Sequence, residues 1–174
     1  MPATGAPIHV HAVRRYHFLI ALAVVLLDRG TKWLVAARME LHDSISILPG
    51  FFRLTYVQNT GAAFGLFSES SSEWKTAVLV VFSLVALTIV AVMLWKSSHA
   101  LTSTGIGLSL ILGGALGNLW DRVVQGHVVD FFDFHLGSYH WPAFNIADSA
   151  IVVGAGLMVL EILLTKTPAE EKAR

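Results

Sequence analysis

The sequence contains no cysteine and few charged residues. Of its 174 residues, 14% are Asp, Glu, Lys or Arg, whereas a soluble domain carries roughly a quarter. The lack of cysteine excludes disulfides, thiolate metal sites and a cysteine nucleophile, and it leaves the redox compartment undetermined. The formal net charge is zero, so no basic surface indicates a nucleic-acid partner.

Long apolar segments are what the chain has instead. Hydrophobic residues make up 55% of it and the mean hydropathy is +0.64. Four segments approach the length of about 20 mostly apolar residues that crosses a bilayer: residues 18–37, 77–95, 101–119 and 143–164. The first could also be a cleaved signal peptide, because two arginines precede it. Since its apolar run resumes as WLVAA after a charged interruption, we favour a retained helix.

Basic residues near the segment ends predict the orientation. On one side they lie in the amino-terminal flank, in the link between the second and third segments and in the tail (Arg14, Arg15, Lys96, Lys166, Lys172 and Arg174). On the other side they are spread over much longer connections (Arg38, Arg53, Lys75 and Arg122). We therefore expect both termini in the cytoplasm.

Each of the two long outer connections contains a strand-like stretch, residues 52–58 and 127–134, rich in β-branched and aromatic residues. The predicted fold class is a membrane all-α protein. It consists of one domain, residues 1–174, with a four-transmembrane-helix bundle and a small extracytoplasmic β element.

Polar residues occur in pairs at one depth of this predicted bundle. Asp28/Lys32 and Asn118/Arg122 are spaced i,i+4 and Asn145/Asp148 i,i+3, so each pair shares a helix face. A charge at the bilayer centre costs about 2.5 kcal/mol or more, so such faces should turn toward one another or toward water. All three lie near the outer membrane surface, where together they form a candidate site.

Several of these residues have simpler explanations. Asp28 and Lys32 can form an intrahelical salt bridge that serves packing, which we consider their main role. Arg122, near a helix end, can extend to lipid headgroups or take part in the site. Asp121 and Asp133 are expected to be solvated at the interface.

Asp130 and Asp148 are less easily explained by structure alone. Each follows an apolar stretch, and neither has a lysine or arginine within four positions. Paired carboxylates share a proton, because repulsion splits their titration. The ionised one can then take a proton from water while its protonated partner hydrogen-bonds a scissile carbonyl. These residues therefore predict an intramembrane aspartyl protease.

Other catalytic chemistries have weaker support in the sequence. No serine has a nucleophile-elbow setting. His127, Asp130, His135 and His140 cluster in one connection, but their spacing matches no helical metal motif. We expect exposed interface histidines, with no metal and no cofactor.

Five motifs, in order from residue 28 to residue 149, resemble the lipoprotein signal peptidases (type II signal peptidases) of bacterial inner membranes. They are DRGTK at 28–32, NTGAAFG at 59–65, GGALGNLWDR at 113–122, GHVVDF at 126–131 and FNIADS at 144–149. Trp120 departs from the pattern, because the family usually has a smaller aliphatic residue there.

The resemblance implies that Asp130 and Asp148 are the catalytic pair. It further implies that the substrates are prolipoproteins cleaved before a diacylglyceryl cysteine. Supporting or substrate-contacting roles are implied for the residues that match the other motifs (Asp28, Lys32, Asn59, Asn118, Arg122 and Asn145). Gly61, in the GAAFG segment, would let a loop lie close over the bound peptide. We expect an inner-membrane monomer in contact with lipid, with its site near the periplasmic face.

Two other function classes, a transporter and a non-enzymatic binding factor, make different predictions. A small transporter should distribute polar groups through the membrane depth, whereas here they gather at one end. A non-enzymatic lipoprotein-binding factor would tolerate Asp→Asn changes at positions 130 and 148, which separates it from an enzyme.

Overall fold

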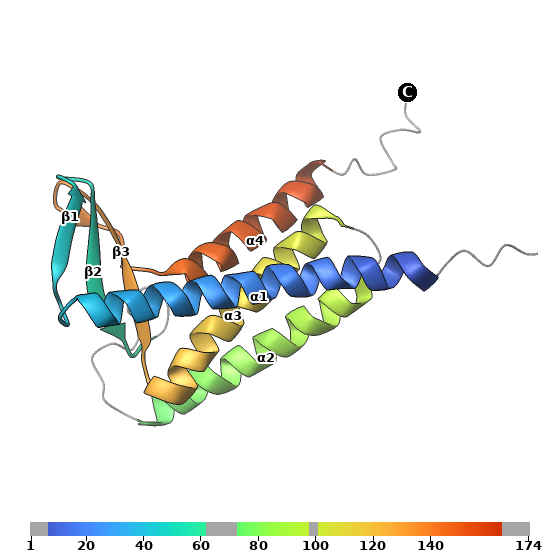
Figure 1. Ribbon diagram of the computed structural model, residues 1–174, viewed down its shortest axis with the longest axis horizontal. Helices are drawn as coiled ribbons and strands as arrows, with labels where there is room; N and C mark the ends of the chain where they lie inside the picture. The colour runs from blue at the N-terminus through green and yellow to red at the C-terminus, as the bar shows by residue number, and fades with distance from the viewer. Residues whose placement is uncertain (1–6, 62–72, 98–100, 165–174) are drawn as a thin grey trace, which may run out of the picture.

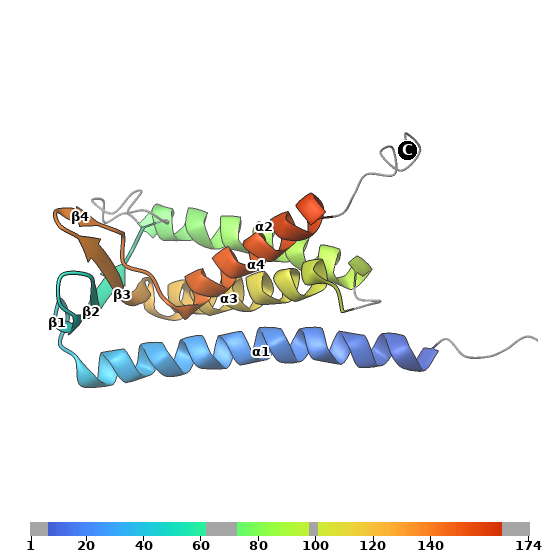
Figure 2. The same ribbon diagram turned by 90° about the horizontal axis from the view of Figure 1, so that it is seen from above.

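The computed structural model describes residues 7–61, 73–97 and 101–164. Four helices form a bundle, and a small sheet lies at one of its ends (Figure 1). The elements are α1 (Pro7–Arg38), β1 (Ser44–Leu48), β2 (Phe52–Asn59), α2 (Glu73–Ser97), α3 (Ser103–Gln125), β3 (Val128–Leu136), β4 (Tyr139–His140) and α4 (Ile146–Leu164). The first residues of α1 and the last residues of α4 lie at the end of the bundle opposite the sheet (Figure 2).

Helix α3 is the central element and packs against each of the other three helices. Its glycines permit this close packing, as small residues do in membrane helix pairs. A Cβ on Gly107 would lie 2.6 Å from the carbonyl oxygen of Gly154 in α4, and one on Gly113 would lie 2.6 Å from that of Ala21 in α1. The helix ends at Gly126, whose φ of 75° turns the chain toward β3.

The sheet has the order β1-β2-β3-β4 with antiparallel neighbours. A bulge in β2 between Leu54 and Val57 shifts its register against β3. Val129 and Phe131 of β3 pack with Val35 near the end of α1, so a small apolar cluster fixes the sheet to the bundle. The two predicted strands are confirmed as β2 and β3, and β1 and β4 are additional.

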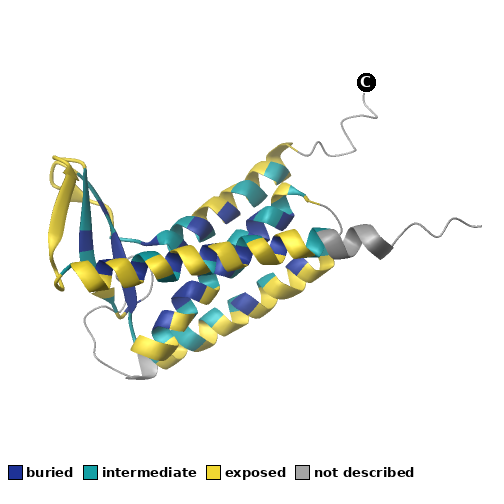
Figure 3. Ribbon diagram, viewed as in Figure 1, coloured by how far each residue is buried: buried dark blue, intermediate teal, exposed yellow. Residues whose placement is uncertain are grey.

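Burial is inverted relative to a soluble protein. Large apolar side chains are exposed on all four helices, including Phe82 of α2 at 72% and Leu163 of α4 at 75%. Charged and amide groups lie inside, with Asp28 and Asn145 fully buried. In Figure 3 the buried positions follow the inner faces of the helices and the exposed positions follow the outer faces. This is the arrangement expected when lipid is the solvent.

Among the described helices, two are apolar enough over a sufficient length to cross a membrane by composition alone: Thr76–Ser97 in α2 and Ile146–Leu164 in α4. The other two carry more polar groups. Helices α1, α2 and α3 are longer than the apolar segments 18–37, 77–95 and 101–119, and α4 begins three residues after the start of 143–164. Helix α3 runs to Gln125, so Asp121 lies on the same helix as Asn118 and Arg122.

Candidate active site

The start of α4 holds Asp148 through a reciprocal cap. Asn145 precedes the helix, and its Oδ1 accepts the Asp148 main-chain N–H at 3.0 Å. Asp148 Oδ2 in turn accepts the Asn145 main-chain N–H at 3.3 Å. This is the capping-box arrangement, with an amide and a carboxylate as the two side chains. It places the Asp148 carboxylate at the positive end of the helix dipole.

Asp130 reaches the same place from the sheet. It is the third residue of β3, opposite Val57 of β2, and is 3% exposed. Its Oδ1 accepts from Asn145 Nδ2 at 2.7 Å and its Oδ2 from Asn59 Nδ2 at 3.0 Å. Asn145 therefore bonds both carboxylates, with its side chain to Asp130 and its main chain to Asp148.

Two further amides are oriented by donors behind them. Asn59 Oδ1 accepts the Gly61 main-chain N–H at 2.9 Å, so its Nδ2 faces Asp130. Asn118 Oδ1 accepts from Lys32 Nζ at 2.9 Å, so its Nδ2 faces Asp148 Oδ1 at 2.7 Å. Each amide oxygen is occupied by a donor, and each amide nitrogen is directed at a carboxylate.

Burial and the neighbouring Asp148 charge raise the pKa of Asp130 to about 7. The hydrogen bonds from Asn59 and Asn145 act in the opposite direction, because they stabilise the ionised form. Burial is the larger influence. Asp130 therefore keeps its proton to a higher pH than an ordinary aspartate does.

A buried ionic network lies behind the two carboxylates. Lys32 Nζ is 2.8 Å from Asp28 Oδ2 and 2.7 Å from Asp121 Oδ2. Arg29 pairs with the other oxygen of Asp121. Asp28 Oδ1 accepts the main-chain N–H of Ala147 at 3.0 Å, in the first turn of α4. Two acids and two bases thus balance their charges inside the bundle and connect α1, α3 and α4.

Most predicted site residues are brought together. The cluster comprises Asp28, Lys32, Asn59, Gly61, Asn118, Asp130, Asn145 and Asp148. Arg122 lies one turn beyond Asn118 and donates from Nη1 to the Asn118 main-chain carbonyl at 3.2 Å. Residues 62–65 of the GAAFG segment lie outside the described residues. Trp120, the departure from the family pattern, is 56% exposed and lies 5.9 Å from the Arg29 guanidinium.

The predictions that Asp121 and Asp133 are solvated were wrong. Asp121 is fully buried in the ionic network, and Asp133 is 7% exposed and pairs with Arg53. Asp121 follows Asn118 by three residues and so shares its helix face. The spacing argument that pairs Asn118 with Arg122 applies to Asp121 as well, but its position at the outer end of the segment favoured a solvated side chain. Arg29 was also missed as a network member.

The histidine cluster is arranged differently from its order in the sequence. Among the described residues, the grouped side chains are Asp133, His135 and His140, with potential ligand atoms within 4.8 Å of one another. Asp130 belongs instead to the amide-lined pair with Asp148.

A family model and curated relatives both match this chain to the lipoprotein signal peptidases. A family model described as Signal peptidase (SPase) II matches residues 20–164. The lipoprotein signal peptidase of Solibacter usitatus (strain Ellin6076) is 45% identical over 150 residues, which are 86% of this chain and 92% of that protein. The lipoprotein signal peptidase of Desulforapulum autotrophicum is 47% identical over 154 residues, 86% of this chain and 93% of that protein.

Two solved structures are also similar. Both are described as bacterial membrane enzymes determined by the in meso method. One is 34% identical with a TM-score of 0.70, covering 85% of this chain and 87% of the other. The second is 33% identical with a TM-score of 0.69, covering 87% and 94%.

Proposed function

The chain belongs to the signal peptidase II family, whose aspartic-type peptidases remove signal peptides from prolipoproteins, and we propose that Asp130 and Asp148 are its catalytic pair. The observation that carries the proposal is the shared contact with Asn145, which bonds Asp130 through its side chain and Asp148 through its main chain. One residue thereby fixes both carboxylates relative to each other.

The chemistry follows from two carboxylates with one proton between them. The ionised carboxylate removes a proton from water as the water oxygen attacks the scissile carbonyl carbon. The protonated carboxyl donates a hydrogen bond to the carbonyl oxygen, where negative charge develops. When the intermediate collapses, the carboxyl that took the proton from water donates it to the peptide nitrogen, and the C–N bond breaks. The new carboxyl remains on the signal peptide, and the new amino group belongs to the lipid-modified cysteine.

We assign the proton to Asp130 and the role of base to Asp148. The raised pKa of Asp130 supports the first assignment, because it keeps its proton to a higher pH than an ordinary aspartate does. The position of Asp148 supports the second, because its carboxylate lies at the positive end of the α4 dipole and accepts the Asn145 main-chain N–H. The amide nitrogen of Asn118 is its second donor.

The remaining polar residues act as positioning residues in this proposal. Lys32 holds the oxygen of Asn118 and thereby aims its nitrogen at Asp148. Asp28 receives the Ala147 N–H and fixes the first turn of α4 against α1. Asn59 and Gly61 hold Asp130 from the side of β2. Arg122, one turn along α3, is available to the substrate backbone.

All four helices span the membrane in this proposal, with the sheet and the carboxylates near the periplasmic face and both termini in the cytoplasm. The exposed apolar surface on every helix supports this arrangement, as do helix lengths of 19 to 32 residues. At about 1.5 Å per residue, even the shortest reaches nearly the thickness of a hydrocarbon core, about 30 Å. The substrate's acyl chains then stay in lipid while its scissile bond enters from the outer interface. A monomer supplies every residue that the mechanism uses.

The proposal is tested with purified enzyme and two substrates, a diacylglyceryl-modified prolipoprotein and the same precursor without the lipid. Mass spectrometry should show loss of the signal peptide, before the cysteine, from the lipidated form alone. Cleavage at another peptide bond, or equal cleavage of the precursor without the lipid, would refute the proposed function.

A further inference from the structure

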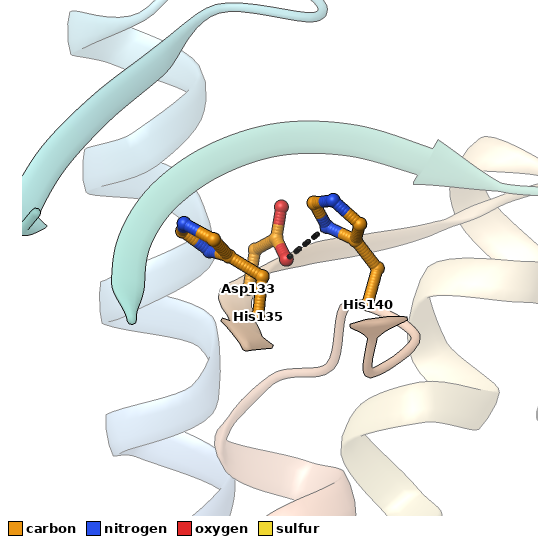
Figure 4. A group of neighbouring side chains, drawn as sticks. All are labelled: Asp133, His135 and His140. Carbon is orange, nitrogen blue, oxygen red and sulfur yellow. Dashed lines mark ion pairs between the residues drawn. The ribbon is translucent and has the colours of Figure 1, made fainter. Parts of the chain in front are cut away.

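The β3–β4 hairpin groups three potential metal ligands away from the carboxylate pair. Asp133 and His135 are two residues apart on β3 and so share one face of the strand. His140 lies directly opposite His135 on β4, after a short turn at Gly137, whose φ is 61°. Figure 4 shows the Asp133 carboxylate between the two imidazoles. One potential ligand atom from each residue lies within 4.8 Å of the others.

Two buried polar atoms of this cluster lack a hydrogen-bond partner among the described residues. Asp133 is 7% exposed, and its Oδ2 accepts from Arg53 Nε at 2.5 Å. Its Oδ1 is buried without a hydrogen bond from any described residue, and His135 Nδ1 is in the same condition. His140 Nδ1 lies 3.8 Å from this Oδ1, beyond hydrogen-bond distance. Buried polar atoms in native proteins are almost always satisfied, and here two unsatisfied polar atoms belong to one cluster.

The ligand types select the class of ion. Two imidazole nitrogens and one carboxylate oxygen suit Zn²⁺ and its neighbours, whereas Ca²⁺ and Mg²⁺ require mostly oxygen. Tetrahedral zinc with bonds of about 2.0–2.1 Å separates its ligand atoms by about 3.4 Å. The His140 side chain is half exposed, so it can rotate to close the remaining gap. Arg53 would then hold the outer carboxylate oxygen, as second-shell donors do in metal sites.

We infer that Asp133, His135 and His140 form a binding site for a divalent transition-metal ion of the Zn²⁺ type, separate from the catalytic pair. Asp133 follows Asp130 by three residues on a strand, so the two side chains leave opposite faces. The ion would fasten β4 to β3. Five residues after His140 the chain reaches Asn145, which contacts both catalytic carboxylates, so the ion would stiffen the segment that leads into the site.

The test uses full-length enzyme in detergent, carrying no histidine tag and stripped of metal by chelator. Zn²⁺ alone is titrated against a chromophoric competitor. The wild type should bind one equivalent with micromolar affinity or better. The double variant His135→Ala/His140→Ala should lose this binding by more than the factor of about 10–100 typical of an outer-shell change. The matched control, His127→Ala, removes a neighbouring histidine outside the cluster and should bind as the wild type does.

A second readout is the thermal unfolding midpoint, which Zn²⁺ should raise in the wild type and in His127→Ala but not in the double variant. Circular dichroism of the metal-free proteins checks that the variants are folded. If the double variant is misfolded, His140→Gln, at the half-exposed position, replaces it and should bind Zn²⁺ at least tenfold more weakly than the wild type. The inference is overturned if the wild type binds no stoichiometric Zn²⁺, or if the histidine variants bind it as tightly as the wild type.

Discussion

At the scale of single residues, three asparagines determine how the carboxylates are held. Asn59, Asn118 and Asn145 each have their side-chain oxygen engaged by a donor, and each offers its nitrogen to Asp130 or Asp148. Neutral amides bond the carboxylates without fully neutralising them, so the charge of Asp148 still acts on Asp130. A lysine in direct contact would instead hold both acids ionised.

The pH profile of cleavage follows from this environment. The pKa of Asp130 is raised to about 7, so the protonated form that the mechanism needs is present below that pH and is lost above it. We expect kcat/KM to fall as pH rises through about 7, approaching a tenfold decrease per further unit. Initial rates on a lipidated substrate measure this. A kcat/KM that stays level or rises on the alkaline side would show that protonated Asp130 is not required.

Residue spacing predicted much of this site. The structure confirms the Asp28–Lys32 contact across one turn of α1. Asn145 and Asp148 are also in contact, but as a helix cap, because Asn145 precedes α4. Asp121 was missed because its position at the outer end of the third apolar segment favoured a solvated side chain. The grouping of Asp133 with His135 and His140 depends on strand pairing and on a turn, and sequence spacing alone does not determine which strand residues face each other.

At the scale of elements, close contact between α3 and its neighbours sets the precision of the site. Asn118 belongs to α3 and Asp148 to α4, so any separation of these helices lengthens their hydrogen bond of 2.7 Å. Three glycines of α3 (Gly113, Gly114 and Gly117) belong to a motif that the sequence analysis identified. Which of them faces α1 and which faces α4 depends on helix rotation, which composition does not determine.

A single methyl group tests this packing. In Gly107→Ala the new Cβ would lie 2.6 Å from the Gly154 carbonyl oxygen. We expect destabilisation of about 1–3 kcal/mol, as for other overpacked interiors. The control is Gly156→Ala in α4, where a Cβ meets nothing within 4 Å and alanine favours the helix. Thermal unfolding in detergent compares the two. Equal midpoints would show that the helices do not meet closely at Gly107.

At the scale of the whole molecule, the chain has a polar interior and an apolar exterior. Ionic groups join α1, α3 and α4 on the inside, and large hydrophobic side chains face outward. The amino-acid sequence predicted four apolar segments, but their limits only approximately. Polar residues inside α1 and α3 lower the mean hydropathy that identifies α2 and α4.

The proposed orientation can be tested because the chain has no cysteine of its own. Ser138→Cys lies in the β3–β4 turn, and Ser103→Cys lies at the first residue of α3, where the side chain is also exposed. In cells with a permeabilised outer membrane, an impermeant maleimide should label position 138. It should label position 103 only after the inner membrane is opened. Equal labelling of both positions before opening would contradict the proposed topology.

Cleavage by enzyme variants that lack one carboxylate tests most directly whether Asp130 and Asp148 are the catalytic pair. Asp130→Asn and Asp148→Asn keep the side-chain shape and remove the acid–base function, so each should lower kcat on a lipidated prolipoprotein by about 10²- to 10⁴-fold. Asp43→Asn makes the same chemical change at an exposed loop position and should cleave at the wild-type rate. Loss of activity in both site variants, with folded protein and an active control, is the predicted result. Wild-type cleavage by either Asp130→Asn or Asp148→Asn would contradict the assignment of these residues as the catalytic pair.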